Sequence, residues 1–288
     1  MEKFISGSTT LVGLLANPIK HSCSPIMQNA AFKELGLDYA YLAFEVNEDQ
    51  FEAAVAGLKA MNARGCNISM PYKQKIIKYM DELTAEAKLC GAVNTVINDD
   101  GKLIGHITDG SGYMNSLKDA GFNIIGEKMT IAGAGGAATA ICIQAALDGV
   151  KEISIFNKKD SFYEKAKETV KTITENTNCI CNLFDIDDKE RLRKEINDSV
   201  IFINGTGIGM KPHEGETFIE KDMLRPELIV SDIIYEPAKT RLLEIAEKVG
   251  CSTINGLGMM IFQGAESFKC WTGKEMPIEH IKKILNNV

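Results

Sequence analysis

The residues best placed to do chemistry lie in the run Asn67-Ile68-Ser69-Met70-Pro71-Tyr72-Lys73. Asn67 and Ser69 alternate with apolar residues in a short strand, so both polar side chains are expected on one face. Lys73 follows directly, where its side chain can reach into a cleft. A lysine just beyond a strand is also typical of an exposed loop, so both interpretations of Lys73 stay open on this evidence.

Two serines form a second polar group. Ser22 and Ser24 precede a helix that is expected to run from Pro25 to about Leu35. Ser24 suits the N-cap and Pro25 the first helical position, whereas Ser22 is not needed for capping. Two hydroxyls at a helix start can hold a polyol or a carboxylate. The pair is therefore either a substrate site or, for Ser24, only a cap.

A glycine-rich turn follows the apolar run 129–132 and precedes a helix-compatible run over 137–147. Such a join between strand and helix brings backbone N–H groups at the helix N-terminus close to a pyrophosphate. A glycine cluster alone fits a plain tight turn equally well. The predicted phosphate-facing loop consists of Ala134, Gly135, Gly136 and Ala137.

Four polar residues follow the next expected strand, Glu152–Phe156. Dinucleotide-binding folds meet the adenosine ribose at this place, where an acid binds the 2′-OH of NAD and cations bind the 2′-phosphate of NADP. This loop carries both kinds of group, so it favours neither cofactor by charge alone. The predicted ribose-binding residues are Asn157, Lys158, Lys159 and Asp160.

Two later segments follow expected strands, namely Asn204-Gly205-Thr206-Gly207 and Asp232-Ile233-Ile234-Tyr235. Because the carboxyl ends of parallel strands meet at one sheet edge, these two segments are expected beside the same ligand. A further glycine-containing segment, Asn255-Gly256-Leu257-Gly258, precedes the next expected helix. The residues predicted to contact the cofactor there are Thr206, Ile233 and Gly256.

Two further polar residues have an ordinary and a functional explanation. Asp109, in Thr108-Asp109-Gly110, begins a helix, and the helix dipole alone favours an acid at that position. Gln263 lies among apolar neighbours on a later helix, where it is structural unless it faces a cleft and binds a hydroxyl. Neither residue is assigned a function by its local sequence.

Composition limits the possible functions. The chain has 288 residues and a net charge of −7, which argues against nucleic acid or an anionic membrane as the main partner. No apolar run approaches the ~20 residues of a membrane helix, and the N-terminus lacks the apolar core of a signal peptide. A cytoplasmic protein follows. The eight cysteines and four histidines show no metal-site spacing, so we expect buried reduced thiols and no metal.

Strand and helix patterns alternate from residue 128 onward, with strands expected at 129–132, 152–156, 200–204 and 229–233. This alternation is typical of a parallel sheet wound with helices. The earlier part predicts strands at 11–15, 39–46 and 66–70, a hairpin near 92–107, and helices that include 49–63, 72–83 and 84–91. The chain is therefore predicted to be an α/β protein with a Rossmann-like parallel sheet.

With these residues laid out, the chain resembles the shikimate dehydrogenase family along nearly its full length, and most of all its quinate/shikimate dehydrogenase branch. Seven motifs in order carry the resemblance, which makes it far more specific than any one of them. They are Asn17-Pro18-Ile19-Lys20-His21-Ser22-Cys23-Ser24-Pro25, Asn67-Ile68-Ser69-Met70-Pro71-Tyr72-Lys73, Gly91-Ala92-Val93-Asn94-Thr95, Thr108-Asp109-Gly110, Gly133-Ala134-Gly135-Gly136-Ala137, Gly256-Leu257-Gly258-Met259 and Gln263-Gly264-Ala265.

The resemblance implies two domains and a division of labour among the motif residues. Residues 1–108 with 257–288 are expected to form the substrate domain, and residues 109–256 the NAD(P)-binding Rossmann domain. Lys73 and Asp109 are the implied proton-transfer pair. The implied substrate-binding residues are Ser22, Ser24, Ser69, Asn94, Gln263 and Tyr235. A small-molecule substrate, shikimate or quinate, follows, and a homodimer is possible.

The implied reaction interconverts shikimate and 3-dehydroshikimate, and also quinate and 3-dehydroquinate, by hydride exchange with a nicotinamide. A charged lysine suits proton donation to the developing alkoxide. In the oxidising direction a neighbouring Asp109 carboxylate would favour the charged form of Lys73, so either residue, or the two as one unit, can be the base. The alternatives are another small-substrate dehydrogenase with a lysine acid/base and a regulator that binds without turnover.

Two departures from the family pattern bear on these expectations. Position 107 is Ile where the family usually has Asn. The loop at residues 157–160 differs from the arginine-containing motif of strictly NADP-using members. Asp160 therefore predicts a preference for NAD, with NADP possible.

Overall fold

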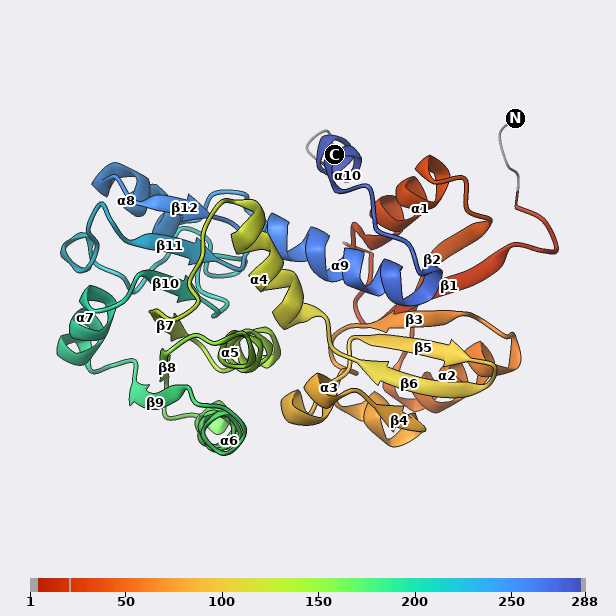
Figure 1. Cartoon of the computed structure of the whole chain (residues 1–288), viewed down its shortest axis with the longest axis horizontal. Helices are drawn as coiled ribbons and strands as arrows, with labels where there is room; N and C mark the ends of the chain where they lie inside the picture. Colours follow the sequence, from red (N-terminus) through yellow and green to blue (C-terminus); the bar gives the residue numbers. More distant parts are fainter. Residues whose placement is uncertain (1–4, 21, 286–288) are drawn as a thin grey trace. The chain divides into compact units, whose positions relative to one another are not determined.

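The computed structural model describes residues 5–20 and 22–285, and the chain forms two compact units (Figure 1). One unit comprises residues 1–108 and 261–288, and the other residues 109–260. Each unit contains one six-stranded sheet. The predicted α/β class with a Rossmann-like parallel sheet is confirmed.

The first unit is built on a mixed sheet with the strand order β2-β1-β3-β5-β6-β4. Strand β1 runs parallel to β2 and β3, whereas β5 is antiparallel to both β3 and β6. The buried faces of β1 and β3 form the centre of this unit. The strands are β1 (Thr10–Ala16), β2 (Tyr39–Glu45), β3 (Gly65–Ile68), β4 (Glu82–Leu83), β5 (Thr95–Asp99) and β6 (Lys102–His106).

Helices cover this sheet. They are α1 (Ser24–Glu34), η1 (Glu48–Gln50), α2 (Phe51–Ala60), η2 (Lys75–Tyr79), α3 (Ala85–Cys90) and α10 (Ile278–Leu285), together with most of α9 (Leu257–Thr272). The predicted helix over 72–83 is wrong: that segment holds a short 3-10 helix and the edge strand β4. A two-residue strand beside β6 depends on a partner distant in sequence, which helical periodicity does not report.

The second unit has an entirely parallel sheet with the order β12-β11-β10-β7-β8-β9. Its strands are β7 (Lys128–Ala132), β8 (Glu152–Asn157), β9 (Ile180–Asp185), β10 (Ile201–Asn204), β11 (Ile229–Asp232) and β12 (Ser252–Ile254). Sequence patterns predicted β7, β8, β10 and β11 and missed β9 and β12. The two missed strands lie at the sheet edges and are only partly buried, so their sequences lack the continuous apolar run of a central strand.

Helices wind this sheet, and the strand order reverses between β7 and β10. The helices are α4 (Asp109–Asp119), α5 (Gly136–Asp148), α6 (Ser161–Asn176), α7 (Lys189–Asn197), η3 (Lys221–Met223) and α8 (Arg241–Val249). Chains that leave β7 and β10 go to opposite faces, so a crevice opens at the carboxyl ends of these two strands. Ligands of open parallel sheets bind at such a crevice.

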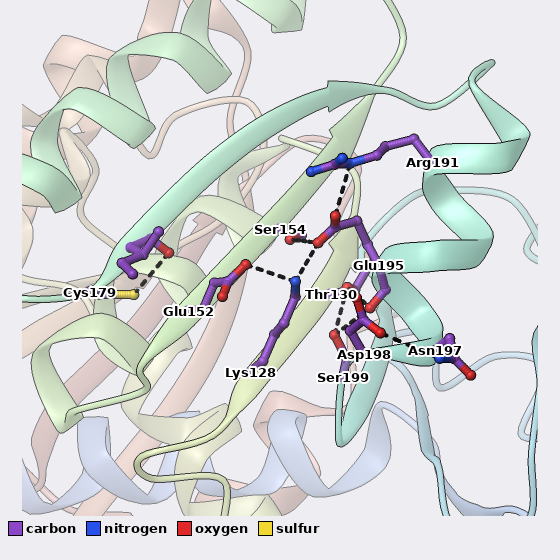
Figure 2. Close-up of polar contacts among 11 residues, drawn as sticks. Lys128, Thr130, Glu152, Ser154, Cys179, Arg191, Glu195, Asn197, Asp198 and Ser199 are labelled. Carbon is purple, nitrogen blue, oxygen red and sulfur yellow. Dashed lines mark hydrogen bonds and ion pairs between the residues drawn. The ribbon is translucent and has the colours of Figure 1, made fainter.

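At the amino end of the same sheet, a buried carboxylate joins α7 to the strands (Figure 2). Glu195 of α7 forms ion pairs with Lys128 of β7 and with Arg191, and it accepts a hydrogen bond of 2.6 Å from the Ser154 hydroxyl. Lys128 also pairs with Glu152 at 2.7 Å between nitrogen and oxygen. We call these five residues the Glu195 network. Its buried charge is compensated by cations on two sides.

Two classes of feature are absent from the described part of the chain. No helix there is long and apolar enough to cross a membrane. No group of three or more His, Cys, Asp or Glu side chains within residues 5–20 and 22–285 is arranged to hold a metal ion.

Candidate active site

The turn after β7 is shaped by close backbone contact. Gly133 has a φ of +102°, and a Cβ there would lie 2.6 Å from the carbonyl oxygen of Gly205. A side chain at Gly133 is therefore excluded both by backbone conformation and by space. The tight fit brings the turn after β7 against the loop after β10.

The start of α5 faces open space. A Cβ built on Gly135 or Gly136 would meet no atom within 4 Å. Gly135 is the N-cap and supplies no side-chain hydrogen bond, and the first turn has no acidic residue. Backbone N–H groups at such a helix start attract an anion, because the helix dipole adds positive charge there. The residues present fit the pyrophosphate of a dinucleotide.

A cavity of about 640 Å³ adjoins this helix start, wholly within the second unit. It extends from the glycine turn across the ends of β8, β9 and β10. Its lining residues are Gly133, Ala134, Gly135, Asn157, Lys158, Asp160, Phe162, Ile186, Asp187, Lys189, Gly205, Thr206, Gly207, Ile208, His213, Glu216, Thr217 and Phe218. The volume lies within the range of small-molecule and cofactor sites.

Six of the residues predicted to bind cofactor line this cavity, namely Ala134, Gly135, Asn157, Lys158, Asp160 and Thr206. The other five predicted residues, Gly136, Ala137, Lys159, Ile233 and Gly256, are not among its lining residues. Ile233 and Gly256 do meet each other: a Cβ on Gly256 would lie 2.0 Å from the Ile233 carbonyl oxygen. The backbone after β11 and the backbone after β12 are therefore in close contact.

The charged residues after β8 are engaged with the protein. The Asp160 carboxylate is the N-cap of α6 and accepts from the Phe162 N–H at 2.8 Å and the Asn157 side-chain amide at 3.2 Å. The Lys159 ammonium pairs with Asp185 at 3.0 Å. Lys158 is exposed and lines the cavity. Helix capping therefore accounts for an acid at this position without any ribose contact.

Sequence reasoning missed the outer wall of the cavity. This wall comes from the segment after β9, Ile186 to Lys189, and from the loop between β10 and η3 that contains His213 and Phe218. The Lys189 ammonium lies 5.5 Å from the centre of the Phe218 ring and donates to the Ile186 carbonyl at 3.2 Å. Recognition of β9 as a strand would have indicated the part of this wall between β9 and α7, because the carboxyl ends of parallel strands meet at one edge.

The loop after β10 is held by hydrogen bonds to the buried side chain of Asn204. The Asn204 side-chain oxygen accepts from the Thr206 N–H at 3.1 Å and from the Thr206 hydroxyl at 2.7 Å. The Thr206 hydroxyl oxygen in turn accepts from the Ile208 N–H at 3.1 Å. The Asn204 amide nitrogen donates to both oxygens of Asp232 at 3.1 Å. Thr206 therefore takes its position from side chains at the ends of two strands.

In the first unit, the structure brings Asn94 and Gln263 together. The Asn94 amide nitrogen donates to the Thr108 hydroxyl at 2.9 Å and to the Gln263 side-chain oxygen at 3.5 Å. The Thr108 hydroxyl donates to the Gln263 backbone oxygen at 2.9 Å. Asn94 is 2% exposed, whereas Gln263 is half-buried. These contacts fix the two amides that were predicted to bind substrate.

The two predicted substrate serines lie at the start of α1. The Ser22 hydroxyl accepts from the Ser24 N–H at 3.2 Å, and Cys23, not Ser24, is the N-cap. The predicted cap at Ser24 is wrong, because the helix begins one residue earlier than expected. Burial and the nearby Cys66 raise the pKa of Tyr41 well above its ordinary value, and a hydrogen bond with the Ser24 hydroxyl lowers it in part. His21, part of the same motif, lies outside the described residues.

Lys73 and Ser69 lie just beyond β3, and both are half-buried. The Ser69 N–H donates to the Leu15 carbonyl at 3.0 Å, and the Lys73 carbonyl accepts from the Val93 N–H at 2.8 Å. These bonds attach the segment after β3 to β1 and to the segment before β5. The other two predicted residues belong to the second unit: Asp109 is the buried first residue of α4, and Tyr235 follows β11 half-buried.

Comparison with known proteins identifies the family. Residues 14–96 match the model of the shikimate dehydrogenase substrate binding domain, and residues 256–285 match that of the shikimate 5′-dehydrogenase C-terminal domain. The chain is 65% identical over 282 residues to a protein of Listeria innocua named shikimate dehydrogenase (NADP(+)), covering 98% of this chain and 97% of that protein. The chain belongs to the shikimate dehydrogenase family.

Solved structures of shikimate dehydrogenase relatives agree with this assignment. Shikimate 5-dehydrogenase from Listeria monocytogenes, crystallised with shikimate and NAD, is 64% identical, with a TM-score of 0.96 and 99% coverage of both chains. Quinate dehydrogenase from Corynebacterium glutamicum, in complex with NAD, is 25% identical, with a TM-score of 0.88 over 97% of this chain and 99% of that one. The protein is thus an oxidoreductase of the shikimate dehydrogenase family.

The predicted preference for NAD is wrong. The Listeria innocua relative is named for NADP(+), although the Listeria monocytogenes structure contains NAD. The inference from Asp160 failed for a physical reason. Its carboxylate already accepts hydrogen bonds at the start of α6, so its presence reports a helix cap.

Proposed function

We propose that the protein is an NADP-dependent shikimate dehydrogenase that interconverts shikimate and 3-dehydroshikimate. The observation that carries this proposal is the cavity beside the start of α5, where backbone N–H groups and glycines fit a dinucleotide. Substrate identity is supported by the relatives described above. When bound, the cofactor supplies or accepts the hydride.

Lys73 and Asp109 are proposed as the proton-transfer pair. Reduction of the ketone places a hydride on the ring carbon and needs one proton on the oxygen, and an ammonium group is suited to supply that proton. Lys73 follows a segment anchored to two neighbouring segments, which limits its backbone freedom. Asp109 is the buried first residue of α4, at the end of the helix where the dipole is positive.

Substrate orientation is assigned to Ser22, Ser24, Ser69, Asn94, Gln263 and Tyr235. Support comes from the hydrogen-bonded pair of Asn94 and Gln263, since side chains held by the protein lose little freedom when they bind a ligand. Hydroxyl and amide groups of this kind match a ring that carries hydroxyls and a carboxylate.

Quinate is proposed as a second substrate. The observation that favours it is the likeness to a quinate dehydrogenase over nearly the whole chain. Both substrates present ring hydroxyls and a carboxylate, so the same polar residues can bind either one. Initial rates with quinate and with shikimate at equal cofactor concentration decide this point, and absence of quinate turnover removes it.

The decisive experiment is a steady-state assay with shikimate and NADP, followed at the absorbance of the reduced nicotinamide. Lys73→Ala is expected to lower kcat by at least about 100-fold, the typical loss when a general acid–base group is removed. NADPH binding by that variant should stay close to wild type. Near-normal turnover by Lys73→Ala would refute the assignment, and binding without turnover by the wild type would indicate a regulator.

A cytoplasmic location is also proposed on the sequence evidence, and a homodimer on the family resemblance alone. Cell fractionation tests the first and light scattering of the purified chain tests the second. A membrane-bound or a monomeric protein, respectively, would contradict them.

A further inference from the structure

We propose that the buried carboxylate of Asp232 is a positioning group that holds the segments around the cofactor cavity in their binding geometry. Asp232 is the last residue of β11 and is fully buried. It does not itself line the cavity. This inference rests on the proposed binding of NADP and adds a residue that no motif assigns to it.

The carboxylate joins three separate segments. Its Oδ1 accepts from the Asn204 amide and from the Ile234 N–H, each at 3.1 Å. Its Oδ2 accepts from the Thr240 hydroxyl at 2.7 Å and again from the Asn204 amide at 3.1 Å. One side chain therefore connects the end of β10, the turn after β11 and the start of α8.

The contact with Asn204 continues into the cavity wall. The Asn204 amide nitrogen donates to Asp232 and also to the Ile208 carbonyl at 3.0 Å. Both bonds turn its side-chain oxygen toward Thr206, from which it accepts twice. Thr206 and Ile208 line the cavity. Rotation of the Asn204 amide would replace an acceptor by a donor opposite the Thr206 N–H. The orientation of the Thr206 loop thus depends on a carboxylate that lies behind it.

The contact with Ile234 connects the carboxylate to the segment of Gly256, which was predicted to bind cofactor but does not line the cavity. The Gly256 N–H donates to the Ile234 carbonyl at 2.9 Å, and the Gly256 backbone leaves no space for a Cβ beside Ile233. The N–H of the same Ile234 is held by Asp232. The carboxylate therefore holds the backbone to which Gly256 is hydrogen-bonded.

A carboxylate is chemically suited to hold these three segments. The partners described above are an amide, a hydroxyl and a backbone N–H, all neutral donors. A carboxylate can accept from all three at once, whereas an asparagine must present one donor group to them. Burial raises the pKa of Asp232, and the bonds from Thr240, Ile234 and Asn204 lower it in part. Burying a carboxylate without a compensating cation costs folding free energy. Stability alone therefore does not account for an acid at this position.

The first test compares Asp232→Asn with Glu195→Gln. Both variants neutralise a buried carboxylate in the same unit, but the Glu195 network lies at the opposite end of the sheet. The dissociation constant of NADPH, from its fluorescence, is expected to rise roughly tenfold in Asp232→Asn, the effect of losing one or two buried hydrogen bonds. It should not change in folded Glu195→Gln. Equal affinity in both variants at matched stability would overturn the proposal.

If Asp232→Asn does not fold, two variants of Thr240 test the same proposal. Thr240→Val removes the hydroxyl that donates to Asp232 while keeping the side-chain shape, and Thr240→Ser keeps the hydroxyl. We expect several-fold weaker NADPH binding in Thr240→Val and recovery in Thr240→Ser, with the KM for shikimate close to wild type in both. Wild-type NADPH affinity in Thr240→Val would contradict a positioning role.

Hydrogen exchange separates this inference from the proposed function. Amides of residues 205–209 are expected to exchange faster in Asp232→Asn and Thr240→Val than in the wild type and Glu195→Gln. Failure of the wild type to bind NADPH would refute the cofactor proposal, and the exchange rates would still test the loop positioning. Unchanged exchange in both variants would reject the role of Asp232.

Discussion

The two ends of the parallel sheet in the second unit hold buried carboxylates in opposite ways. At the amino end, Glu195 is surrounded by Lys128 and Arg191, so its charge is paired (Figure 2). At the carboxyl end, Asp232 is surrounded by the neutral donors of Asn204 and Thr240. Charge pairing holds a helix to the strands, whereas an acid with several neutral donors sets the orientation of loops.

The two ends of the sheet also differ in how they use glycine and long side chains. The carboxyl end has Gly133 and Gly205 in backbone contact and open space above Gly135. The amino end has long charged side chains over strand starts. An end that binds a ligand must leave backbone N–H groups accessible, and an end that only closes the fold can fill its space with side chains.

The largest effect is expected from breaking the amino end. Glu195→Ala should reduce the free energy of unfolding by about 3–5 kcal/mol, because it leaves a partly buried lysine and an arginine without their shared acid. Urea unfolding measures this, with Glu152→Ala as the matched control. Glu152 is more exposed, so its loss should cost about 1 kcal/mol or less. Equal losses in both variants would show that burial of Glu195 is not what matters.

Next in size is a substitution at the carboxyl end. Gly133→Ala should destabilise the protein by at least about 2 kcal/mol, since the residue has a positive φ and its Cβ would meet the Gly205 carbonyl. It should also weaken NADPH binding, because relief of the contact displaces the loop after β10. Gly57→Ala, in α2 of the other unit, is the control, as its Cβ meets no atom. Thermal unfolding and NADPH titration of both variants check this, and a mild Gly133→Ala would contradict the close contact.

The two carboxylates should respond to pH with opposite sign. Burial raises the pKa of Glu195, but hydrogen bonds and charges from Lys128, Ser154 and Arg191 outweigh it, so that pKa lies below its ordinary value. Its stabilisation is therefore present above the ordinary value of about 4.3 and is lost as pH falls through the folded pKa. The pKa of Asp232 is raised, so its stabilisation is present below about 3.9 and is lost as pH rises through the folded pKa.

Urea unfolding at a series of pH values measures this difference. The stability gap between wild type and Glu195→Gln should shrink on acidification below about pH 4, whereas the gap between wild type and Asp232→Asn should shrink as pH rises above about 4. If the two stability differences change with pH in the same direction, the opposite pKa shifts of Glu195 and Asp232 are contradicted.

The smallest effect concerns the cavity wall that no motif indicated. Lys189→Ala should weaken NADPH binding by a few-fold, on the order of 0.5–1 kcal/mol, as expected for a partly exposed cation near a phosphorylated ligand. Lys194→Ala, on the same helix but away from the cavity, is the control. Fluorescence titration at low and high salt measures both. An unchanged affinity in Lys189→Ala would restrict the cofactor site to the glycine turn and the β8 loop.

The sequence determined the parts of the protein that depend on local patterns. Buried central strands appear as continuous apolar runs, and Gly133 to Gly136 follow one of them, so the class of fold and the glycine turn between β7 and α5 were predictable. Ordered motifs with Lys73 and Asp109 identified the family. Each of these signals lies within a few residues, where sequence spacing translates directly into geometry.

Only the tertiary structure decided the rest. Strand β4 consists of two residues and exists through its pairing with β6, and β9 is an edge strand without a continuous apolar run. Asp160 caps a helix although its position suggested a ribose ligand, because a carboxylate accepts whichever donors lie nearest in space. Asp232 meets Asn204 from 28 residues away. Contacts between distant residues depend on chain closure, which no local pattern encodes.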